Sequence, residues 1–417
     1  MAHDDSHSQL ELMQARVKFI PEGWAFNYVG NAFSIKNNLR KPISEGEREK
    51  NPGIYPYYGP TKIQGHIGTF EQDGSYALIG EDGDHFLKYE LQSMTQLVDG
   101  KCTVNNHAHI IEGTKKATRE WFYYYFMHRD IFSFLSRQGA GRYKLNKASL
   151  EKIPLLVPPV QEQKKIAKIL STWDKAITTT EQLLANSQQQ KKALMQQLLT
   201  GKNRLLDKNG VRFNGEWQFQ RISSVSTRVQ RKTDGDDHPI LTISSLSGFV
   251  RQDVRYSRYM AGESVKNYIL LKKREFAYNK GNSKSYQFGC IFDLEDHESG
   301  LVPHVYVCFK LNEGLSHRYF KYLFAADYLK PQLGALVNTG VRNNGLLNIK
   351  PSEFLATKVP VPNIEEQERI ADTLHASSET IKNLELQIKA LENEKKALMQ
   401  QLLTGKRRVS VSKEIAR

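Results

Sequence analysis

The sequence predicts a mixed α/β (α+β) protein in which two globular domains, called heads below, are joined by two long antiparallel helices with pseudo-twofold symmetry. The first observation is a repeat: KKALMQQLLTGK occurs at 191–202 and again at 395–406, an offset of 204 residues. The second is a heptad-like apolar pattern that leads into each copy. The third is that the segments before these helices hardly resemble each other, so duplicated connectors join divergent heads.

The duplication extends well upstream of the twelve identical residues. The same offset superimposes Glu162-Gln163 on Glu366-Gln367 and Ile166-Ala167 on Ile370-Ala371 without a gap. A period of this length is too long for a solenoid unit, which indicates a duplicated domain with its connector. The copies of the connector would have kept a common partner, whereas the heads would have diverged toward different targets.

Each connector is predicted to be a long helix, because apolar residues recur at steps of four and three, as in a coiled coil. Prolines precede each run and Gly201 and Gly405 follow, which suits a helix start and stop. The predicted seam is Ile166, Leu170, Ile177, Leu184, Leu194 and Leu198 in the first helix and Ile370, Leu374, Ile381, Leu384, Ile388, Leu391, Leu398 and Leu402 in the second. Chain order predicts antiparallel pairing; the alternative is two independent amphipathic helices, each packed on its own head.

The charge balance favours a polyanionic partner. Lys and Arg number 59 against 45 Asp and Glu, giving a formal net charge of +14 and a pI near 9.4. Nucleic acid is the leading partner for such a chain. A basic protein with no nucleic-acid role is the alternative, and charge alone does not decide between them.

Cysteine content and hydropathy indicate a cytoplasmic protein. The three cysteines, Cys102, Cys290 and Cys308, lack the spacing of a zinc site and the even count of a disulfide framework. No metal site and no catalytic residue are predicted. The sequence has neither a secretion signal nor an apolar stretch long enough to span a membrane.

The first head carries a candidate DNA-binding segment with alternating polar side chains. Lys62, Gln64 and His66 lie between glycines in a predicted loop or edge strand. Long polar side chains there could enter the major groove, and glycines let the backbone approach phosphate. The alternative is a solvated hairpin.

A second candidate in the first head lies within the segment 139–146. Arg142, Tyr143 and Lys144 suit a phosphate or base contact, and a helix C-cap followed by a surface turn is the alternative. Upstream, a short strand is predicted at 76–79 and an aromatic helix at 120–134.

The second head offers two similar candidates. Amide and ammonium side chains on a predicted flexible turn can read adenine-type and guanine-type edges. These are Asn279, Lys280, Asn282 and Lys284, followed nearer the second connector by Arg342, Asn343 and Asn344. The aromatic segment 317–324 is predicted to form core and not a base-stacking platform.

These features resemble one known family. The paired junctions Pro158…Glu162-Gln163…Ile166-Ala167 and Pro362…Glu366-Gln367…Ile370-Ala371, the initial Pro21-Glu-Gly-Trp24, and the Leu-Leu-Thr-Gly-Lys that closes each helix are similar to those of Type I restriction-modification specificity subunits. The resemblance implies two target-recognition domains, each binding one half of a bipartite, asymmetric double-stranded DNA target, and a coiled-coil spacer that sets the gap.

The resemblance also implies a domain plan and a set of partners. The plan comprises a first recognition domain at 1–157 with an N-terminal extension at 1–15, a spacer helix at 158–204, a second recognition domain at 205–361, a second spacer helix at 362–406 and a tail at 407–417. Two modification (methyltransferase) subunits and restriction (motor-nuclease) subunits would bind this chain in a prokaryotic cytoplasm. S-adenosylmethionine, ATP and Mg would bind those partners, which methylate adenine and cleave DNA, and this chain would hold no cofactor.

The motif content supports a non-catalytic chain. It lacks both the Asn-Pro-Pro-[Phe/Tyr/Trp] run of adenine methylation and the Gly-x-x-x-x-Gly-Lys-[Ser/Thr] run of ATP binding. Glu392-Asn-Glu394-Lys395 is superficially nuclease-like, but a solvated face of the coiled coil is the simpler interpretation. Two alternatives stay open: a self-contained DNA methyltransferase or endonuclease, and a structural coiled-coil tether between proteins.

Overall fold

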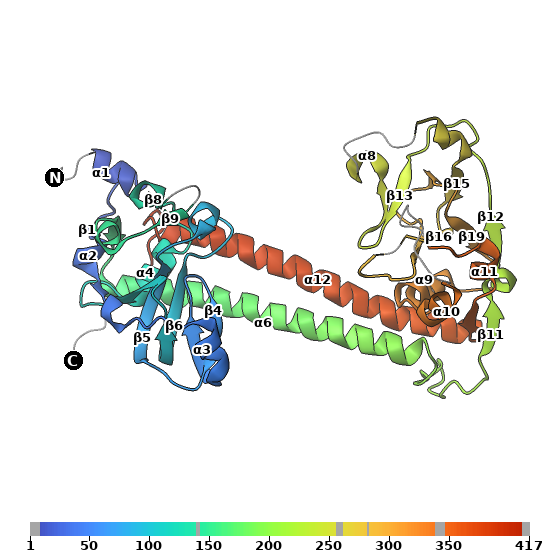
Figure 1. Cartoon of the computed structure of the whole chain (residues 1–417), viewed down its shortest axis with the longest axis horizontal. Helices are drawn as coiled ribbons and strands as arrows, with labels where there is room; N and C mark the ends of the chain where they lie inside the picture. Colours follow the sequence, from blue (N-terminus) through green and yellow to red (C-terminus); the bar gives the residue numbers. More distant parts are fainter. Residues whose placement is uncertain (1–8, 139–141, 256–261, 282, 338–346, 411–417) are drawn as a thin grey trace. The chain divides into compact units, whose positions relative to one another are not determined.

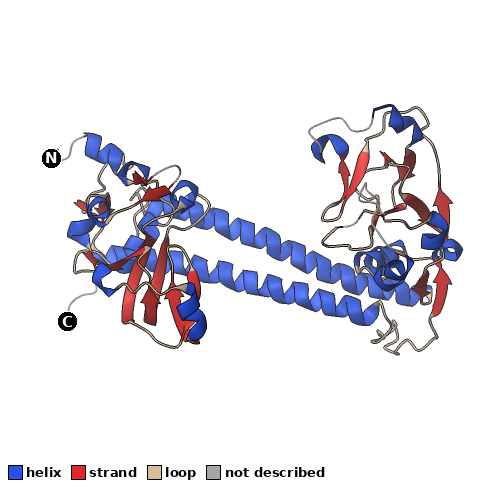
Figure 2. Ribbon diagram, viewed as in Figure 1, coloured by secondary structure: helices blue, strands red, loops and turns tan. Residues whose placement is uncertain are grey.

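The computed structural model of the chain describes residues 9–138, 142–255, 262–281, 283–337 and 347–410. Its internal contacts divide the chain into two compact units: Met1–Glu181 with Leu386–Arg417, and Gln182–Glu385. Each unit therefore holds one head and a part of both long helices. Both units mix strands and helices, which confirms the predicted α/β class (Figure 2).

The two connectors are continuous helices of 39 residues, α6 (Val160–Leu198) and α12 (Ile364–Leu402) (Figure 1). Gly201 and Gly405 follow their ends with φ of 70° and 69°, a left-handed conformation that glycine adopts at little cost. The predicted helices and their glycine stops are confirmed.

The helices run antiparallel within each unit. In the first unit, Lys395 near the end of α12 forms an ion pair of 2.5 Å with Asp174 in the first half of α6. In the second unit, Leu198 at the end of α6 shares a hydrophobic cluster with Ile370 at the start of α12. The start of one helix thus packs beside the end of the other, as chain order predicts.

The predicted seam is the least exposed stripe of both helices. Its members near the heads, among them Leu170 and Leu374, are fully buried, and its central members, such as Leu184 and Leu384, are half-buried. None of the seam residues is exposed. Half-burial in the middle of the helices is expected where only two helices cover each other.

The first head is built on a mixed six-stranded sheet. Its strand order is β2-β7-β5-β6-β3-β4, with β3 and β6 parallel and the other neighbours antiparallel. The strands are β2 (Ser34–Ile35), β3 (Pro52–Tyr58), β4 (Ile63–Ile67), β5 (Gln72–Gly80), β6 (Thr95–Val104) and β7 (Ala108–Glu112). Two antiparallel pairs complete the head: β1 (Ala25–Tyr28) with β10 (Pro154–Val157), and β8 (Ser136–Gln138) with β9 (Arg142–Lys144).

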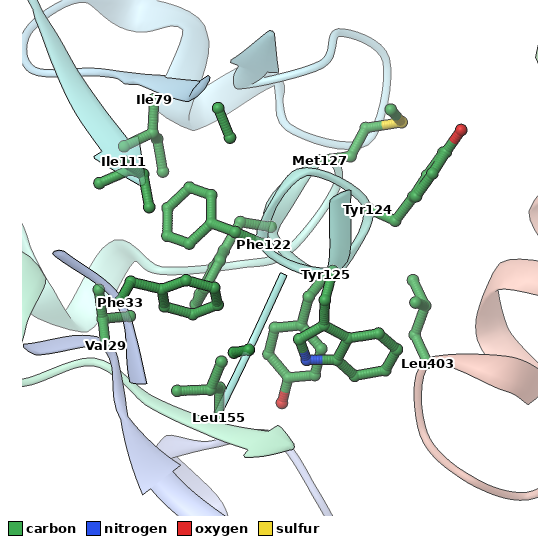
Figure 3. Packing of buried hydrophobic residues seen from close by; sticks show 14 of the residues in the cluster. Val29, Phe33, Ile79, Ile111, Phe122, Tyr124, Tyr125, Met127, Leu155 and Leu403 are labelled. Carbon is green, nitrogen blue, oxygen red and sulfur yellow. The ribbon is translucent and has the colours of Figure 1, made fainter. Parts of the chain in front are cut away.

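The core of the first head lies around the aromatic helix α4 (Arg119–Phe126). Phe122 meets Phe33 edge-on at 5.1 Å between ring centroids, with Ile79 and Ile111 of the sheet nearby (Figure 3). The other helices of this head are α1 (Gln9–Gln14), α2 (Val29–Ala32), α3 (Glu45–Lys50), α5 (Lys147–Glu151) and the 3-10 turns η1 (Asn37–Leu39), η2 (Asp84–Lys88) and η3 (Phe132–Phe134).

The aromatic helix is shorter than the predicted span of 120–134. The carbonyl of Met127 accepts a hydrogen bond from the backbone N–H of Met94, and not from a later residue of the helix. Asp130 then accepts from the backbone N–H of Phe132, which starts a separate turn. The prediction was wrong in length because these competing bonds come from tertiary structure and an aspartate turn.

The second head contains several smaller sheets. A four-stranded sheet has the order β12-β19-β16-β17, and the remaining strands form antiparallel pairs. The strands are β11 (Gln218–Arg221), β12 (Ser226–Val229), β13 (Leu241–Ser244), β14 (Gly248–Arg251), β15 (Ile269–Lys272), β16 (Phe276–Asn279), β17 (Cys290–Asp293), β18 (Ser299–Val302), β19 (Val307–Leu311) and β20 (Lys358–Val361). The pairs are β13 with β14, β15 with β18, and β11 with β20.

The aromatic helix of the second head, α9 (His317–Ala325), belongs to the core. Its side chains Tyr319, Phe320 and Leu323 are fully buried. This confirms the prediction that the segment forms part of the core and is not a platform for stacking bases. The other helices are α7 (Ile222–Val225), α8 (Gln252–Arg255), α10 (Lys330–Leu336), α11 (Pro351–Leu355) and the turn η4 (Gly262–Asn267). Among the helices that the structure describes, none is both long and apolar enough to cross a membrane.

Candidate DNA interface

The first candidate segment of the first head forms the edge of the large sheet. Gln64 and His66 lie on β4, and Lys62 directly precedes it; all three side chains are exposed. The pairing of β4 with β3 is irregular between Ile63 and His66, so side chains do not alternate strictly along this part of the strand. The predicted edge strand is thus present, and its long polar side chains reach solvent.

A buried asparagine supports this edge strand. Asn105, in the turn between β6 and β7, is 4% exposed and donates through Nδ2 to Gln64 Oε1 at 3.0 Å. Its Oδ1 accepts the backbone N–H of His107 at 2.8 Å. The His107 ring in turn lies 2.8 Å from a carboxylate oxygen of Asp82.

The second candidate segment forms a β-hairpin with β8, and not a helix C-cap. Lys144, on β9, bridges in β fashion to Asp82, and its ammonium lies 3.2 Å from the carboxylate of Glu81. Tyr143 packs against Phe132 at 5.1 Å between ring centroids. Only the backbone of Arg142 is described, as the first residue of β9.

Glu81 is the centre of an ion cluster in this head. Burial alone would raise the pKa of Glu81, but the hydrogen bond from Arg40, the nearby His109 and the contact with Lys144 outweigh burial and lower it. Glu81 therefore stays ionised and holds the cations of Arg40 and Lys144. Lys144 is consequently less available to DNA than the exposed Lys62.

The two candidate segments of the first head meet in one hydrogen-bonded network. It runs from Gln64 through Asn105 and His107 to Asp82, which bridges to Lys144. Segments far apart in the sequence are thus brought to one polar surface. Arg40, Glu81, Asp82, Asn105 and His107 were not predicted, because no local pattern marks residues that are assembled by sheet pairing.

The second head brings its candidate segments together in a similar way. The backbone N–H of Leu347 donates to the carbonyl of Lys280 at 3.0 Å, and the Lys280 ammonium donates to the carbonyl of Ile349. Asn279 closes a local turn by accepting the N–H of Gly281 at 3.0 Å, and Lys284 is exposed. The segment after β16 therefore lies beside the chain that follows 338–346.

Part of the predicted set lies outside the described residues. Asn282, Arg342, Asn343 and Asn344 belong to this group. The pairing between Lys280 and Leu347 nevertheless places the described residues that flank both segments next to each other.

A buried carboxylate joins three chain segments in the first unit. Glu162, at the start of α6, is 2% exposed and accepts the indole N–H of Trp24 at 3.0 Å. Arg408, which follows α12, binds the same carboxylate through Nε at 2.8 Å and Nη2 at 2.9 Å, and it also donates to the carbonyl of Glu22. Bidentate pairs of this kind are among the stronger hydrogen-bonded contacts.

The second unit repeats this arrangement with equivalent residues. Glu366, fully buried at the start of α12, accepts the indole N–H of Trp217 at 2.9 Å. Arg204, which follows α6, binds the carboxylate through Nε at 2.5 Å and Nη2 at 2.7 Å, and it donates to the carbonyl of Gly215. We call each Trp–Glu–Arg group a junction clamp.

The glutamine beside each clamp glutamate has a matching role. Gln163 accepts the backbone N–H of Thr118, the N-cap of α4, at 2.8 Å, and Gln367 accepts that of Ser316, the N-cap of α9, at 3.0 Å. Gln163 also donates to the carbonyl of Pro158, and Gln367 donates to the carbonyl of Pro362. The repeated Glu-Gln pair thus fastens each head to the helix that leaves it.

The arginines of the clamps were missed from the sequence, although a signal for them existed. Arg204 and Arg408 are related by the same offset of 204 residues as the repeat, but they lie just beyond its identical core. The identical run ends at Lys202 and Lys406, two residues before each arginine.

One group of side chains in the second head has metal-type spacing. Ligand atoms of Asp234, Asp236 and His238 lie within 4.8 Å of one another, and both aspartates are exposed. The two ring nitrogens of His238 are already hydrogen-bonded, to Ser299 at 2.8 Å and to Asp234 at 2.6 Å. These contacts account for the group without an ion.

Comparison with known proteins agrees with this architecture. Residues 21–186 match the family model described as the Type I restriction modification DNA specificity domain. A putative type I restriction enzyme specificity subunit of Haemophilus influenzae is 37% identical over 138 residues, which span 33% of this chain and 34% of that protein. The MjaVIII specificity subunit of Methanocaldococcus jannaschii is 24% identical over 415 residues, 94% of each chain.

The fold also matches a solved structure over almost its full length. The S subunit of a Type I restriction-modification system from M. genitalium aligns with a TM-score of 0.57 at 12% identity, covering 93% of this chain and 98% of that one. Such identity establishes the shared fold only. Together with the duplicated junctions, it defines the class by fold: two-headed proteins with long connecting helices.

Within that class, residues 21–186 match the DNA specificity domain of Type I restriction-modification systems, and the chain as a whole is similar to specificity subunits of those systems. This similarity assigns the chain to DNA-target recognition, and the relatives are named as specificity subunits and not as the enzymatic components. The comparisons give no support to a structural tether or to a self-contained DNA enzyme.

Proposed function

We propose that each head reads one half of a bipartite, asymmetric DNA target, and that partner subunits methylate adenine and cleave DNA where both halves are bound. In the first head, β4 and the Asn105 network would face the DNA. In the second head, the surface around Asn279, Lys280 and Lys284 would do so.

One observation carries this proposal: equivalent junction clamps hold heads of unlike structure. The first head is built on a six-stranded mixed sheet, whereas the second uses a four-stranded sheet and several pairs. Two different half-targets require heads that differ in structure but are attached to the long helices in the same way. Exposed Lys62 and Lys284 supply donors that suit phosphate or guanine edges.

The same proposal includes two modification subunits and the restriction subunits as cytoplasmic partners. S-adenosylmethionine, ATP and Mg would be held by those partners, since adenine methylation and DNA translocation need them. The repeated exposed faces of the long helices are suitable places for two copies of one partner to bind.

An exchange of the second head tests the proposal. The complex of this chain with its modification subunit would be compared with one whose segment 205–361 comes from a relative, and methylated sites would be mapped by sequencing. We expect the second half of the target to change and the first half to persist. A change in both halves, or in neither, would refute one half per head.

A further inference from the structure

The orientation of one side-chain amide on β4 is determined by the structure. The backbone N–H of His107 can only donate, so the Asn105 atom 2.8 Å from it must be the acceptor Oδ1. The other terminal atom of Asn105, which faces Gln64, is then the donor Nδ2. Its partner at 3.0 Å must be the carbonyl oxygen of Gln64.

Gln64 consequently presents its NH₂ group and not its oxygen. The side chain is exposed, its Oε1 is occupied by Asn105, and no described residue accepts from its Nε2. Gly59 permits this pose, because a Cβ there would lie 2.5 Å from Gln64 Cδ. Asn105 is itself 4% exposed and is held by a bond from its N–H to the carbonyl of Tyr58 at 3.0 Å.

This orientation restricts the base edge that Gln64 can read. A free glutamine amide recognises adenine through a donor and an acceptor together, N7 and N6. Because its oxygen is turned toward Asn105, the part of the Gln64 amide that points away from Asn105 is its NH₂ donor, and the ammonium of Lys62 on the same edge also only donates. Two adjacent donors match the N7 and O6 acceptors of guanine.

We propose that Asn105 is a positioning residue that sets the base preference of the first head by holding the Gln64 amide with its NH₂ toward DNA, so that β4 reads an acceptor-rich, guanine-type edge. This inference rests on the proposed DNA contact of the first head. Asn105 acts through Gln64 and does not itself reach solvent.

The substitution Asn105→Asp reverses the orientation. A carboxylate still accepts the N–H of His107, but its second oxygen can accept only from Gln64, so the amide turns and shows Oε1 outward. The base preference at one position of the first half-site should then move from acceptor-rich guanine to cytosine or adenine, which offer an amino donor, by about tenfold. Asn106→Asp is the matched control, because Asn106 is adjacent and exposed and its side chain has no hydrogen-bond partner among the described residues.

A second variant protects the test against misfolding of N105D. Gln64→Glu lies at an exposed position, keeps one oxygen for Asn105 Nδ2 and turns the other outward, so it should shift preference in the same direction. Gln64→Ala should remove the preference at that position and leave the other positions intact.

The experiment maps methylated sites for the full chain in complex with its modification subunit. The proposal is supported if N105D and Q64E move the same position and N106D does not. It is overturned, with the proposed function intact, if Q64A changes that position while N105D and Q64E behave like N106D. It is also overturned if Q64A changes nothing; a failed exchange of heads would instead reject the proposed function itself.

Discussion

The junction clamp of the second unit gives a sharp prediction about stability. Arg204→Ala leaves the carboxylate of Glu366, 1% exposed, with the indole of Trp217 as its remaining side-chain donor. Breaking a buried ion pair on one side costs about 3–5 kcal/mol. Because the Arg204 side chain is itself 20% exposed, we expect about 3 kcal/mol.

The first unit should respond less to the equivalent change. The Arg408 side chain is 43% exposed, so water can replace more of its interaction with Glu162. We expect Arg408→Ala to cost about 1–2 kcal/mol. The two units need not unfold together, so hydrogen exchange of amides in each unit is the suitable measurement.

A double substitution separates the clamp from general damage. In Arg204→Ala combined with Glu366→Gln, the amide still accepts the Trp217 indole N–H but carries no charge. The double variant should recover at least about 1 kcal/mol over R204A. Arg228→Ala removes an exposed arginine of the same unit and should stay within about 0.5 kcal/mol of the parent. If R204A behaved like R228A, or if E366Q recovered nothing, the clamp would not be a stabilising ion pair.

Three further predictions follow from burial and exposure. Leu374→Ala, at a fully buried seam position, should cost about 2–5 kcal/mol in denaturant unfolding, against less than about 0.5 for Leu183→Ala at a position 51% exposed. Burial lowers the pKa of His85 below its usual value of about 6.5. Below that pH the unfolded chain therefore binds more protons at this residue than the folded chain does. The first unit should therefore lose stability as pH falls below that value, and less so in His85→Gln. Lys284→Ala should weaken DNA binding and lower the slope of log binding constant against log salt concentration by about one. Only recognition of the second half-site should change.

The long helices could be predicted because their pattern is local. Heptad spacing, prolines and glycines mark them within a continuous stretch, and the offset of 204 residues brings one into register with the other. Antiparallel pairing followed from chain order alone. The position of helix α4 was predicted correctly, but its predicted length was too great. Its end depends on a hydrogen bond from the backbone N–H of Met94, which lies on a distant segment.

The heads resisted prediction for a related reason. The edge position of β4 depends on its pairing with β3, and the parallel pairing of β3 with β6 has no local signal. Candidate cations could be found by composition, but not their partners. Lys62 and Lys144 look equivalent in sequence, yet only Lys144 is engaged by Glu81.

The clamps explain which parts of the chain had to stay alike after duplication. Each combines a tryptophan at the start of a head, a glutamate at the start of the helix leaving that head, and an arginine after the helix arriving at it. A transplanted second head must therefore bring its own equivalent of Trp217 to reach Glu366. It must also bring a backbone N–H where Ser316 now caps α9, because Gln367 binds there. A head that lacks either feature should fold poorly on these helices whatever DNA it reads, whereas loops far from both contacts are free to vary with the target.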